Sequence, residues 1–324
     1  MPVLALMVQP GATPSSVMAS LDIFRIADRF VSDAGRFQID LLSAAGGAVA
    51  LAEEIHVQTQ PLPTSLRGYD AVILPGFFAA DLVSLVGQLQ TSWQPVIERL
   101  RTAGERPLIG ASCYGTFVLA ESGLLNGRAA TTTWWMRHAF AQRYPKVRLD
   151  ADRALMADGR RLTAGAMTAH VDLSMQLLRD LASAEVARGV ASIMLVNEAR
   201  PSQRPFMQPL RQFADPLAQR AADWMALHLS GTFSVCDLAA ACHVSYRTLH
   251  RRFREAAGLP PLDYLQTLRV ERAKTLLEEG HLALEGVVAE VGYADVSSFC
   301  RLFVQRVGLS PAQYRRQFRQ ASRG

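Results

Sequence analysis

The sequence predicts two domains of different class, an α/β domain followed by a smaller all-helical domain. The chain has 324 residues, more than one compact core usually holds, and 49% of them are hydrophobic against 19% charged. In the first two-thirds, short apolar runs of strand length alternate with stretches of helical periodicity. In the last third one helical pattern occurs twice at a fixed spacing, which indicates one supersecondary unit used twice.

The apolar runs of the first two-thirds predict buried strands with helices between them. The expected strands are 3–8, 37–43, 70–74 and 107–112, and the expected helices are 15–30 and 93–103. This alternation favours a mostly parallel sheet covered on both faces, a flavodoxin-like three-layer sandwich. A hairpin around Asp158-Gly159 and helices over 168–181 and 185–197 should follow.

Ligand sites in such sheets lie beyond the carboxyl ends of the strands, which here are residues 9–11, 75–77 and 112–114. At the last of these a buried strand runs through Cys113 directly into an amphipathic helix. Backbone N–H groups at such an elbow can lower the pKa of a thiol and make it a nucleophile. A small buried residue at a crowded bend fits equally well, and the residues alone leave both readings open.

Residues 200–216 hold four prolines and few periodic apolar positions, which indicates an interdomain linker with the domain boundary near residue 210. We therefore expect an α/β domain over 1–199 and a helical domain over 217–324.

The helical domain contains the repeat. Residues 238–264 align with 288–314 at an offset of 50 without gaps, and seven positions are identical. The identical pairs are Ala239/Ala289, Arg251/Arg301, Phe253/Phe303, Gly258/Gly308, Leu259/Leu309, Pro261/Pro311 and Tyr264/Tyr314. Each copy predicts a helix, a tight turn and a second helix, with Ser245 and Asp295 as N-caps of the second helices and Gly292 in the second turn.

This is the helix-turn-helix pattern, whose second helix enters the major groove of DNA. The exposed positions of the two second helices are Tyr246, Arg247, His250, Arg251 and Arg254, and then Ser297, Ser298, Arg301 and Gln305. Arginine bonds guanine bidentately, and Ser, His and Gln bond base edges or phosphates. No acidic residue occurs from Ser245 to Arg254. The alternative is a pair of purely structural helical hairpins.

Between the copies, the sequence predicts one helix from Pro261 to Gly280. About 19 helical residues form a rod of about 28 Å. Such a rod can hold two recognition helices over successive major-groove turns, about 34 Å apart on one face of DNA.

At these residues the chain resembles a known family. The stretch from Asp223 to Phe318 resembles the AraC/XylS-type transcriptional regulators, most closely over GYADVSSFCRLFVQRVGLSPAQYRRQF, residues 292–318. The resemblance implies a sequence-specific transcription factor. It also implies that the base contacts come from Arg247, His250 and Arg251 in the first unit and from Ser297, Ser298 and Arg301 in the second.

Residues 3–195 resemble the class I glutamine amidotransferase-like superfamily in its PfpI-like branch, and in particular the sensor half of GlxA-type AraC regulators. The matching pieces are YDAVILPG, residues 69–76, and SCYGTFVLAESGLLNGRAATTTWW, residues 112–135. Cys113 falls on the elbow position of the nucleophile. The resemblance and the strand ends together imply a non-catalytic effector pocket at Gly11, Gly76, Cys113, Tyr114, Thr133 and Trp134.

The chain departs from that family at two positions that bear on catalysis. Hydrolytic relatives have His after the elbow Cys, where this chain has Tyr114, and GlxA-type sensors often have His where this chain has Thr133. His138 and His170 do not fall on a motif position. A thiol without a base partner is poorly equipped for acyl transfer, so we expect no catalytic residue. Trp134 and Trp135 can be an aromatic wall for a cationic ligand or simply core.

Charge and cysteine content narrow the remaining classes. The net charge is +5, and the C-terminal arginines Arg315, Arg316, Arg319 and Arg323 fit phosphate contact. The four cysteines form no CxxC pair, so no disulfide framework, metal or other cofactor is expected, and a reducing cytoplasm is the expected compartment. The start of the chain lacks the basic region of a signal peptide, and no apolar run reaches the length of a membrane span.

We therefore expect a cytoplasmic regulator without membrane contact that binds double-stranded DNA and a small-molecule effector as a homodimer. RNA polymerase is a further candidate partner. Two alternatives remain at this point. One is a Cys-dependent amidase or hydrolase with a DNA-binding appendage, and the other is an effector-independent DNA-binding protein whose first domain serves only for assembly.

Overall fold

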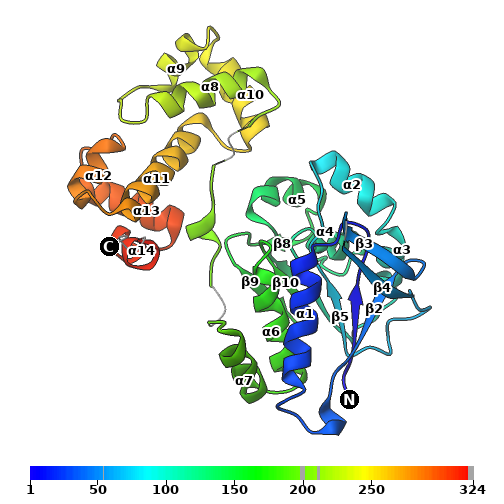
Figure 1. Cartoon of the computed structure of the whole chain (residues 1–324). Coiled ribbons are helices and arrows are strands. Elements are labelled where there is room, and N and C mark those ends of the chain that lie inside the picture. The colour runs from blue at the N-terminus through cyan, green and yellow to red at the C-terminus, as the bar shows by residue number, and fades with distance from the viewer. Residues whose placement is uncertain (54, 198–200, 210–211, 320–324) are drawn as a thin grey trace. The chain divides into compact units, whose positions relative to one another are not determined.

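The structure is a computed structural model that describes residues 1–53, 55–197, 201–209 and 212–319. The chain divides into two compact units, Met1–Gln203 and Arg204–Gly324 (Figure 1). We call them the first and the second unit. The boundary expected near residue 210 lies outside the described residues.

The first unit is built on an eight-stranded sheet with the order β3-β4-β2-β1-β5-β6-β10-β9. Its strands are β1 (Val3–Met7), β2 (Gln38–Ser43), β3 (Gly47–Ala52), β4 (Ile55–Pro61), β5 (Ala71–Leu74), β6 (Leu108–Ser112), β9 (Leu155–Asp158) and β10 (Arg161–Ala164). Neighbouring strands in the series β4-β2-β1-β5-β6-β10 pair in parallel. The edge strands are antiparallel, β3 to β4 and β9 to β10. The central order β2-β1-β5-β6-β10 is the flavodoxin-like order, so the predicted fold class is confirmed.

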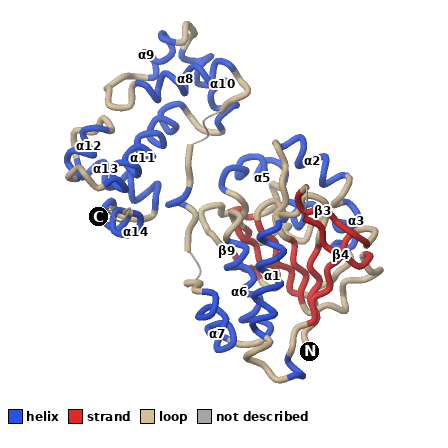
Figure 2. The backbone as a smooth tube through the Cα atoms, in the orientation of Figure 1, coloured by secondary structure: helices blue, strands red, loops and turns tan. Residues whose placement is uncertain are grey.

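Helices cover both faces of this sheet because its central strands are apolar on both sides. Leu4 and Leu6 pack with α1, α6 and α7, whereas Ala5 and Met7 pack on the opposite face with α2 to α5. Figure 2 shows the strands in red between the two helical layers. The helices are α1 (Pro14–Ala27), α2 (Leu82–Gln90), α3 (Gln94–Arg101), α4 (Gly115–Glu121), α5 (Arg137–Arg143), α6 (Ala169–Leu181) and α7 (Ala184–Met194). Shorter elements are η1 (Asp33–Gly35), η2 (Trp134–Met136) and the strand pair β7 (Ala129–Ala130) and β8 (Arg148–Leu149).

The four predicted strands begin or end within one residue of the observed ones, and the hairpin at Asp158-Gly159 is present with Gly159 at φ 61°. Several elements were not predicted from the sequence, among them β3, β4, α2 and α5. Strands β3 and β4 form an edge hairpin that is mostly exposed, and the polar residues of IHVQTQP hide its strand pattern. Edge strands give a weaker apolar signal than the buried strands of a parallel sheet.

The second unit consists of helices around two cores. Its elements are η3 (Arg204–Phe206), α8 (Pro216–Leu227), α9 (Val235–Ala241), α10 (Tyr246–Ala257), α11 (Pro261–Glu279), α12 (Leu284–Glu290), α13 (Val296–Val307) and α14 (Pro311–Phe318). One core lies among α8, α9, α10 and the start of α11, and the other among the end of α11 and α12 to α14. The predicted connecting helix is α11, with 19 residues shared between both cores.

The repeat is present, but its alignment without gaps is wrong for the first helices. Helices α10 and α13 lie 50 residues apart, whereas α9 and α12 lie 49 apart, because the second turn is one residue longer. The backbone N–H of Val244 donates to Ala239, and the equivalent bond joins Tyr293 to Val288. Ala239 therefore corresponds to Val288 and not to the identical Ala289.

Candidate functional site

The first candidate interface is the exposed side of α10. The Ser245 side chain accepts a hydrogen bond from the backbone N–H of Thr248 and so caps the helix, as predicted. Leu249 and Phe253 are fully buried, which fixes the orientation of the helix. The opposite side carries the predicted base-contact residues, the exposed Arg247 and Arg251 and the half-buried His250.

The equivalent surface of α13 is organised in the same way. Asp295 caps the helix through the backbone N–H groups of Ser297 and Ser298, and hydrogen bonds from Ser298 hold the pKa of Asp295 below its usual value. Phe299 and Phe303 are fully buried. Ser297 and Arg301 are exposed, and Ser298 is half-buried.

Both recognition helices are tied to their own half of the second unit by an arginine on the inner side. Arg252 of α10 donates two hydrogen bonds to one oxygen of Asp215, at 2.9 and 2.7 Å. Arg306 of α13 donates to Asp263 at 2.8 Å and to Gln266 at 3.0 Å, both on α11. These contacts hold the recognition helices against the helices that carry them.

The outward arginines have partners on their own helix. Arg251 pairs with Glu255 at 3.1 Å, with both side chains well exposed. Arg301 donates to the hydroxyl of Ser298 at 2.9 Å. An exposed ion pair at this helical spacing is worth only about 0.3–0.5 kcal/mol. Arg251 can therefore exchange Glu255 for a base or a phosphate at small cost.

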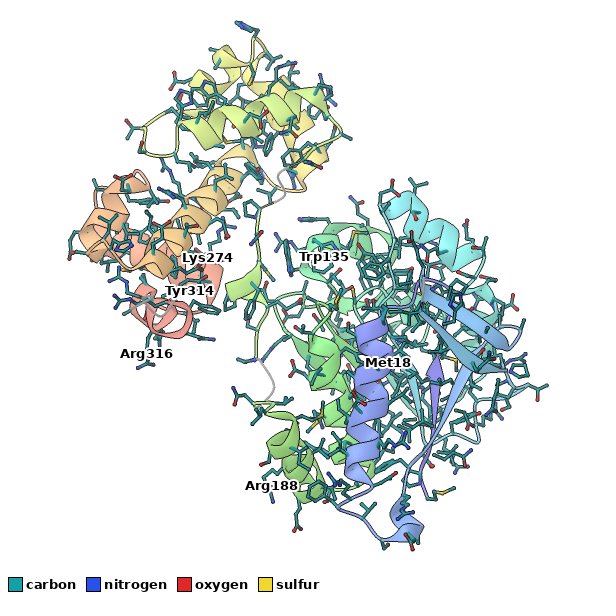
Figure 3. All side chains as sticks on the ribbon, in the orientation of Figure 1. Met18, Trp135, Arg188, Lys274, Tyr314 and Arg316 are labelled. Carbon is teal, nitrogen blue, oxygen red and sulfur yellow. The ribbon has the colours of Figure 1, made fainter. Side chains whose placement is uncertain are left out.

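The C-terminal arginines differ in their exposure and in their hydrogen bonds. Arg315 donates to the carbonyl of Leu282 at 2.8 Å and is half-buried. Arg316 and Arg319 are exposed, and Figure 3 shows Arg316 on the outer side of α14. Arg323 lies outside the described residues. The predicted phosphate contact is thus open to Arg316 and Arg319.

The second candidate site lies at the carboxyl ends of β1, β5 and β6. β1 and β5 are neighbours whose connections leave on opposite sides of the sheet, the position where such sheets bind ligands. The loops after these strands are joined, because Phe78 donates to the carbonyl of Gly11 and Thr13 donates to that of Gly76. Gly11 has φ 77°, which favours glycine.

Cys113 forms a tight elbow against these loops. Its φ is 51°, a left-handed conformation that costs free energy for a residue with a side chain. A Cβ atom on Gly76 would lie 2.9 Å from the Cβ of Cys113, so Gly76 is required for this close approach. The backbone N–H of Cys113 donates to the carbonyls of Ala164 and Gly165, at 3.1 and 2.9 Å. That N–H group is therefore not free to bind a ligand oxygen.

The thiol of Cys113 is buried, and burial raises its pKa to about 12, against a smaller lowering by a hydrogen bond from the backbone of Tyr114. Of the two readings of this position, the structure favours the small buried residue at a crowded bend, because desolvation of the thiol outweighs the nearby N–H group. Within the described ranges, no side chain forms a hydrogen bond with the sulfur. The thiol is neutral at neutral pH.

Aromatic rings line the side of the elbow that faces α2 to α5. Tyr114 packs edge-on against Phe77 and Trp135, and the indole N–H of Trp135 donates to its hydroxyl at 3.1 Å. Trp134 contacts Trp135 edge-on, with ring centroids 5.3 Å apart. The structure thus brings Gly11, Gly76, Cys113 and Tyr114 together directly and connects Trp134 to them through Trp135.

Thr133 is fully buried, and its hydroxyl has no hydrogen-bond partner among the described residues. The preceding Thr132 is attached to the elbow, since its hydroxyl lies 2.6 Å from that of Thr116, which donates to the carbonyl of Cys113. An unpaired buried hydroxyl costs about 1–3 kcal/mol, so a ligand that bonded Thr133 would recover that cost.

The two histidines that lie near the motifs are not partners of the thiol. His138 lies on α5 with an exposed side chain, and partial desolvation of its ring lowers its pKa. His170 is fully buried between two hydroxyls, with Nδ1 2.8 Å from Ser112 and Nε2 2.7 Å from Ser20. Complete burial lowers the pKa of His170 to about 4. Its neutral imidazole joins β6, α6 and α1.

Sequence reasoning missed several residues that build this site, namely Thr13, Thr116, Thr132, His170 and Gln203. The run Thr131-Thr132-Thr133 beside the matched motif was the signal for the threonines. Gln203 had no signal, because it lies in a proline-rich stretch assigned to the linker.

The described residues contain no cluster of three or more His, Cys, Asp or Glu side chains arranged to hold a metal ion. Of their helices, none combines the length and the apolar character that a membrane crossing requires. All four cysteines are free.

Most of the chain is similar to proteins named as HTH-type transcriptional regulators. Residues 238–317 match the helix-turn-helix domain family. The chain is similar to the HTH-type transcriptional regulator CdhR of Pseudomonas aeruginosa, with 27% identity over 310 residues, 94% of this chain and 89% of that protein. It is also similar to the HTH-type transcriptional regulator GlxA of Rhizobium meliloti, with 25% identity over 295 residues, 88% of this chain and 87% of that one.

One solved structure has the same fold over the larger part of the chain. It is a proposed transcriptional regulator protein from Vibrio parahaemolyticus, with a TM-score of 0.50 and 18% identity. The similarity covers 60% of this chain and 99% of that one. At this level of identity the likeness describes the fold.

Proposed function

We propose that this chain, a transcriptional regulator of the AraC/XylS type with a GlxA-type architecture, reads DNA through α10 and α13 and is controlled by a small molecule bound at Cys113. The observation that carries the DNA-binding half is the pair of capped helix-turn-helix units on one shared α11, each with an outward arginine at the same position, Arg251 and Arg301. An arginine so placed can bond a guanine bidentately in the major groove.

The proposed base contacts are Arg247, His250 and Arg251 on α10 and Ser297, Ser298 and Arg301 on α13. Exposure of the arginines and the fixed inner faces of both helices support these roles. A shared helix of 19 residues gives each protomer a reader of two successive major-groove turns.

The proposed effector pocket comprises Gly11, Gly76, Cys113, Tyr114, Thr133 and Trp134. The joined loops at the strand ends, the aromatic rings around Tyr114 and the unpaired hydroxyl of Thr133 support it. These groups suit a ligand with a flat or apolar part and one hydrogen-bonding group.

Control without catalysis is the favoured function of this pocket. A neutral thiol with no side-chain hydrogen-bond partner among the described residues lacks both the charge and the base that acyl transfer requires. The backbone N–H of Cys113, which is already bonded, cannot stabilise an oxyanion. We further propose that residues 1–199 sense the effector and form a homodimer in the cytoplasm, that 217–324 bind DNA, and that RNA polymerase is the partner at the promoter.

DNA selected from a random-sequence pool by the full chain tests the first half of this proposal. We expect one enriched motif with two blocks about one helical turn apart, protected on a single face of the duplex. Selected DNA without any enriched motif would contradict sequence-specific binding.

A screen of small molecules for thermal stabilisation of the full chain tests the second half. For any compound that stabilises it, Cys113→Ser should weaken the stabilisation and leave DNA binding without the compound nearly unchanged.

The strained elbow at Cys113 is the one observation that favours a Cys-dependent amidase or hydrolase instead, because strain of this kind marks nucleophile elbows. Candidate amides incubated with the wild type and with Cys113→Ser decide between the two. Product formed by the wild type and lost in Cys113→Ser would establish the enzyme and overturn the sensor.

A further inference from the structure

The residues just before the end of the first unit are attached firmly to that unit. Arg153 and Ser202 form an isolated antiparallel bridge. The backbone N–H of Gln203 and the hydroxyl of Ser202 both donate to the carbonyl of Asp152, at 2.7 and 2.9 Å. A stretch that the sequence assigns to the linker thus belongs, up to Gln203, to the structure of the first unit.

The side chain of Gln203 is buried in a notch that only glycine permits. A Cβ atom on Gly165 would lie 2.1 Å from the amide oxygen of Gln203. That oxygen accepts from the backbone N–H of Ala166 at 2.9 Å. The amide nitrogen lies 2.9–3.0 Å from three carbonyl oxygens, those of Thr132, Ala151 and Arg153, which share its two N–H groups. One buried amide therefore joins three loops, and removing it would leave several buried groups without partners.

Two of these loops hold the backbone of Cys113. On one side Ala164 and Gly165, directly before Ala166, accept from the N–H of Cys113. On the other side Thr132 is bonded through Thr116 to the carbonyl of Cys113. Both peptide groups of the elbow residue are thus held by the segments that the Gln203 amide fixes.

The residues directly after Gln203 are attached to the second unit. The buried Lys274 of α11 donates to the carbonyl of Met207 at 3.1 Å and pairs with Glu271 at 2.8 Å. The rings of Phe206 and Phe318 pack edge-on at 5.5 Å. Figure 3 shows Lys274 beside Tyr314. Residues 203 and 207 are therefore anchors in different units, separated by three residues of chain.

We propose that Gln203 is the positioning residue of the effector site and the point at which the state of that site is passed to the DNA-binding unit. A ligand that moves the Cys113 elbow or the Thr132-Thr133 loop changes the carbonyls that hold Gln203. Because the chain reaches the Lys274 anchor within four residues, a change at Gln203 acts on the second, α13-containing half of the reader first. This inference rests on the proposed function.

The experiment is a double-mutant cycle in the full chain, with Gly76→Ala as the probe in place of the unidentified effector. The added Cβ displaces the elbow, since it meets Cys113 at 2.9 Å. Gln203→Leu keeps the size of the side chain and removes all its hydrogen bonds. The matched control is Gln176→Leu on α6, whose amide donates to Asp180 at the surface. The readout is the Kd for DNA selected by the wild type.

We expect Gly76→Ala to change the Kd roughly threefold to tenfold in the wild-type and Gln176→Leu backgrounds and to have little effect in Gln203→Leu. An equal effect of Gly76→Ala in all three backgrounds would overturn the proposal, because a merely structural glutamine gives additive changes. If Gly76→Ala does not fold, Thr116→Val replaces it in the same cycle, because it removes the hydroxyl that donates to the carbonyl of Cys113.

A second readout does not depend on DNA. Alkylation of Cys113 by iodoacetamide, followed by mass spectrometry with the exposed Cys236 as internal reference, should be several-fold faster in Gln203→Leu than in the wild type or Gln176→Leu. Unchanged alkylation would show that Gln203 does not hold the elbow. If the wild type binds no DNA, the proposed function fails, while this readout still decides the positioning role.

Discussion

At the scale of single residues, Arg251 and Arg301 have the same position on α10 and α13 but different partners in the free protein. Arg251 pairs with Glu255, a residue one helical turn further on, and Arg301 with the neutral Ser298. Neither contact is strong, so both side chains can reorient toward a base edge.

Arg251→Ala and Arg301→Ala should each weaken binding to selected DNA by about 1–3 kcal/mol and relax the preference at one base pair. Arg188→Ala, an exposed arginine on α7 of the first unit (Figure 3), is the control and should leave binding unchanged. The measurement is fluorescence anisotropy with matched and mismatched duplexes. Full discrimination retained in both variants would exclude base reading by these residues.

The buried thiol gives the first unit a predictable response to alkaline pH. The pKa of Cys113 is raised from 9.0 to about 12, so the folded state keeps the proton that the unfolded chain releases. This contribution to stability is complete below pH 9 and is lost as the pH rises toward 12, by up to about 1.4 kcal/mol per pH unit. Cys113→Ala should therefore reduce the pH dependence of the free energy of unfolding, measured in urea at pH 8 and 10. Equal slopes for the two proteins would mean that the thiol is solvated.

At the scale of the elements, His170 on α6 joins α1 and α6 to β6, the strand that leads into the elbow. A neutral imidazole has one donor and one acceptor, which matches the hydroxyls of Ser20 on α1 and Ser112 on β6. A protonated ring would have no acceptor nitrogen for one of these hydroxyls, and its charge would be buried away from water. Burial therefore keeps the imidazole neutral.

Because the folded pKa of His170 is about 4 and the ordinary value is 6.5, its contribution to stability is present above pH 6.5 and is lost as the pH falls toward 4. The free energy of unfolding should fall by up to about 1.4 kcal/mol per pH unit in this window. His170→Gln should be less stable at pH 7 but less sensitive to acid. His56→Gln, at an exposed position on β4, serves as the control. An unchanged acid slope in His170→Gln would assign the slope to other groups.

At the scale of the whole molecule, each half of the second unit has its own core, joined by α11. Fragments of this unit should therefore fold as helical domains. A fragment of residues 204–324 should be more stable than one of 212–324 by about 1–3 kcal/mol, because only the longer fragment supplies the carbonyl of Met207 to the buried Lys274. Circular dichroism during thermal unfolding measures the difference. Equal stability would mean that Lys274 finds another partner.

Both fragments should bind selected DNA at least about tenfold more weakly than the full chain at the same salt concentration, because a dimer places two readers on one duplex. Equal affinity of fragment and full chain would contradict dimeric binding.

The helix-turn-helix units were predictable from the sequence because their determinants are local. The caps Ser245 and Asp295 and the left-handed glycines Gly258 and Gly308 lie within a few residues of the helices they delimit. The parallel sheet was predictable for a similar reason, since strands buried on both faces, such as Val3–Met7, are continuous apolar runs. The unequal lengths of the two turns were not predictable from the sequence, because one extra residue in a turn leaves the helical periodicity on either side unchanged.

By itself, the sequence therefore determined the class of both units, which segments form the buried parallel strands, and the place of Cys113 at the end of a strand. The tertiary structure decided the chemical state of that cysteine, since burial by segments far apart in the chain raises its pKa. It also decided the role of Gln203, whose amide bonds Thr132 and Ala166 across 71 and 37 residues. Desolvation and long-range hydrogen bonds depend on which distant segments meet, and no local pattern in the sequence records that.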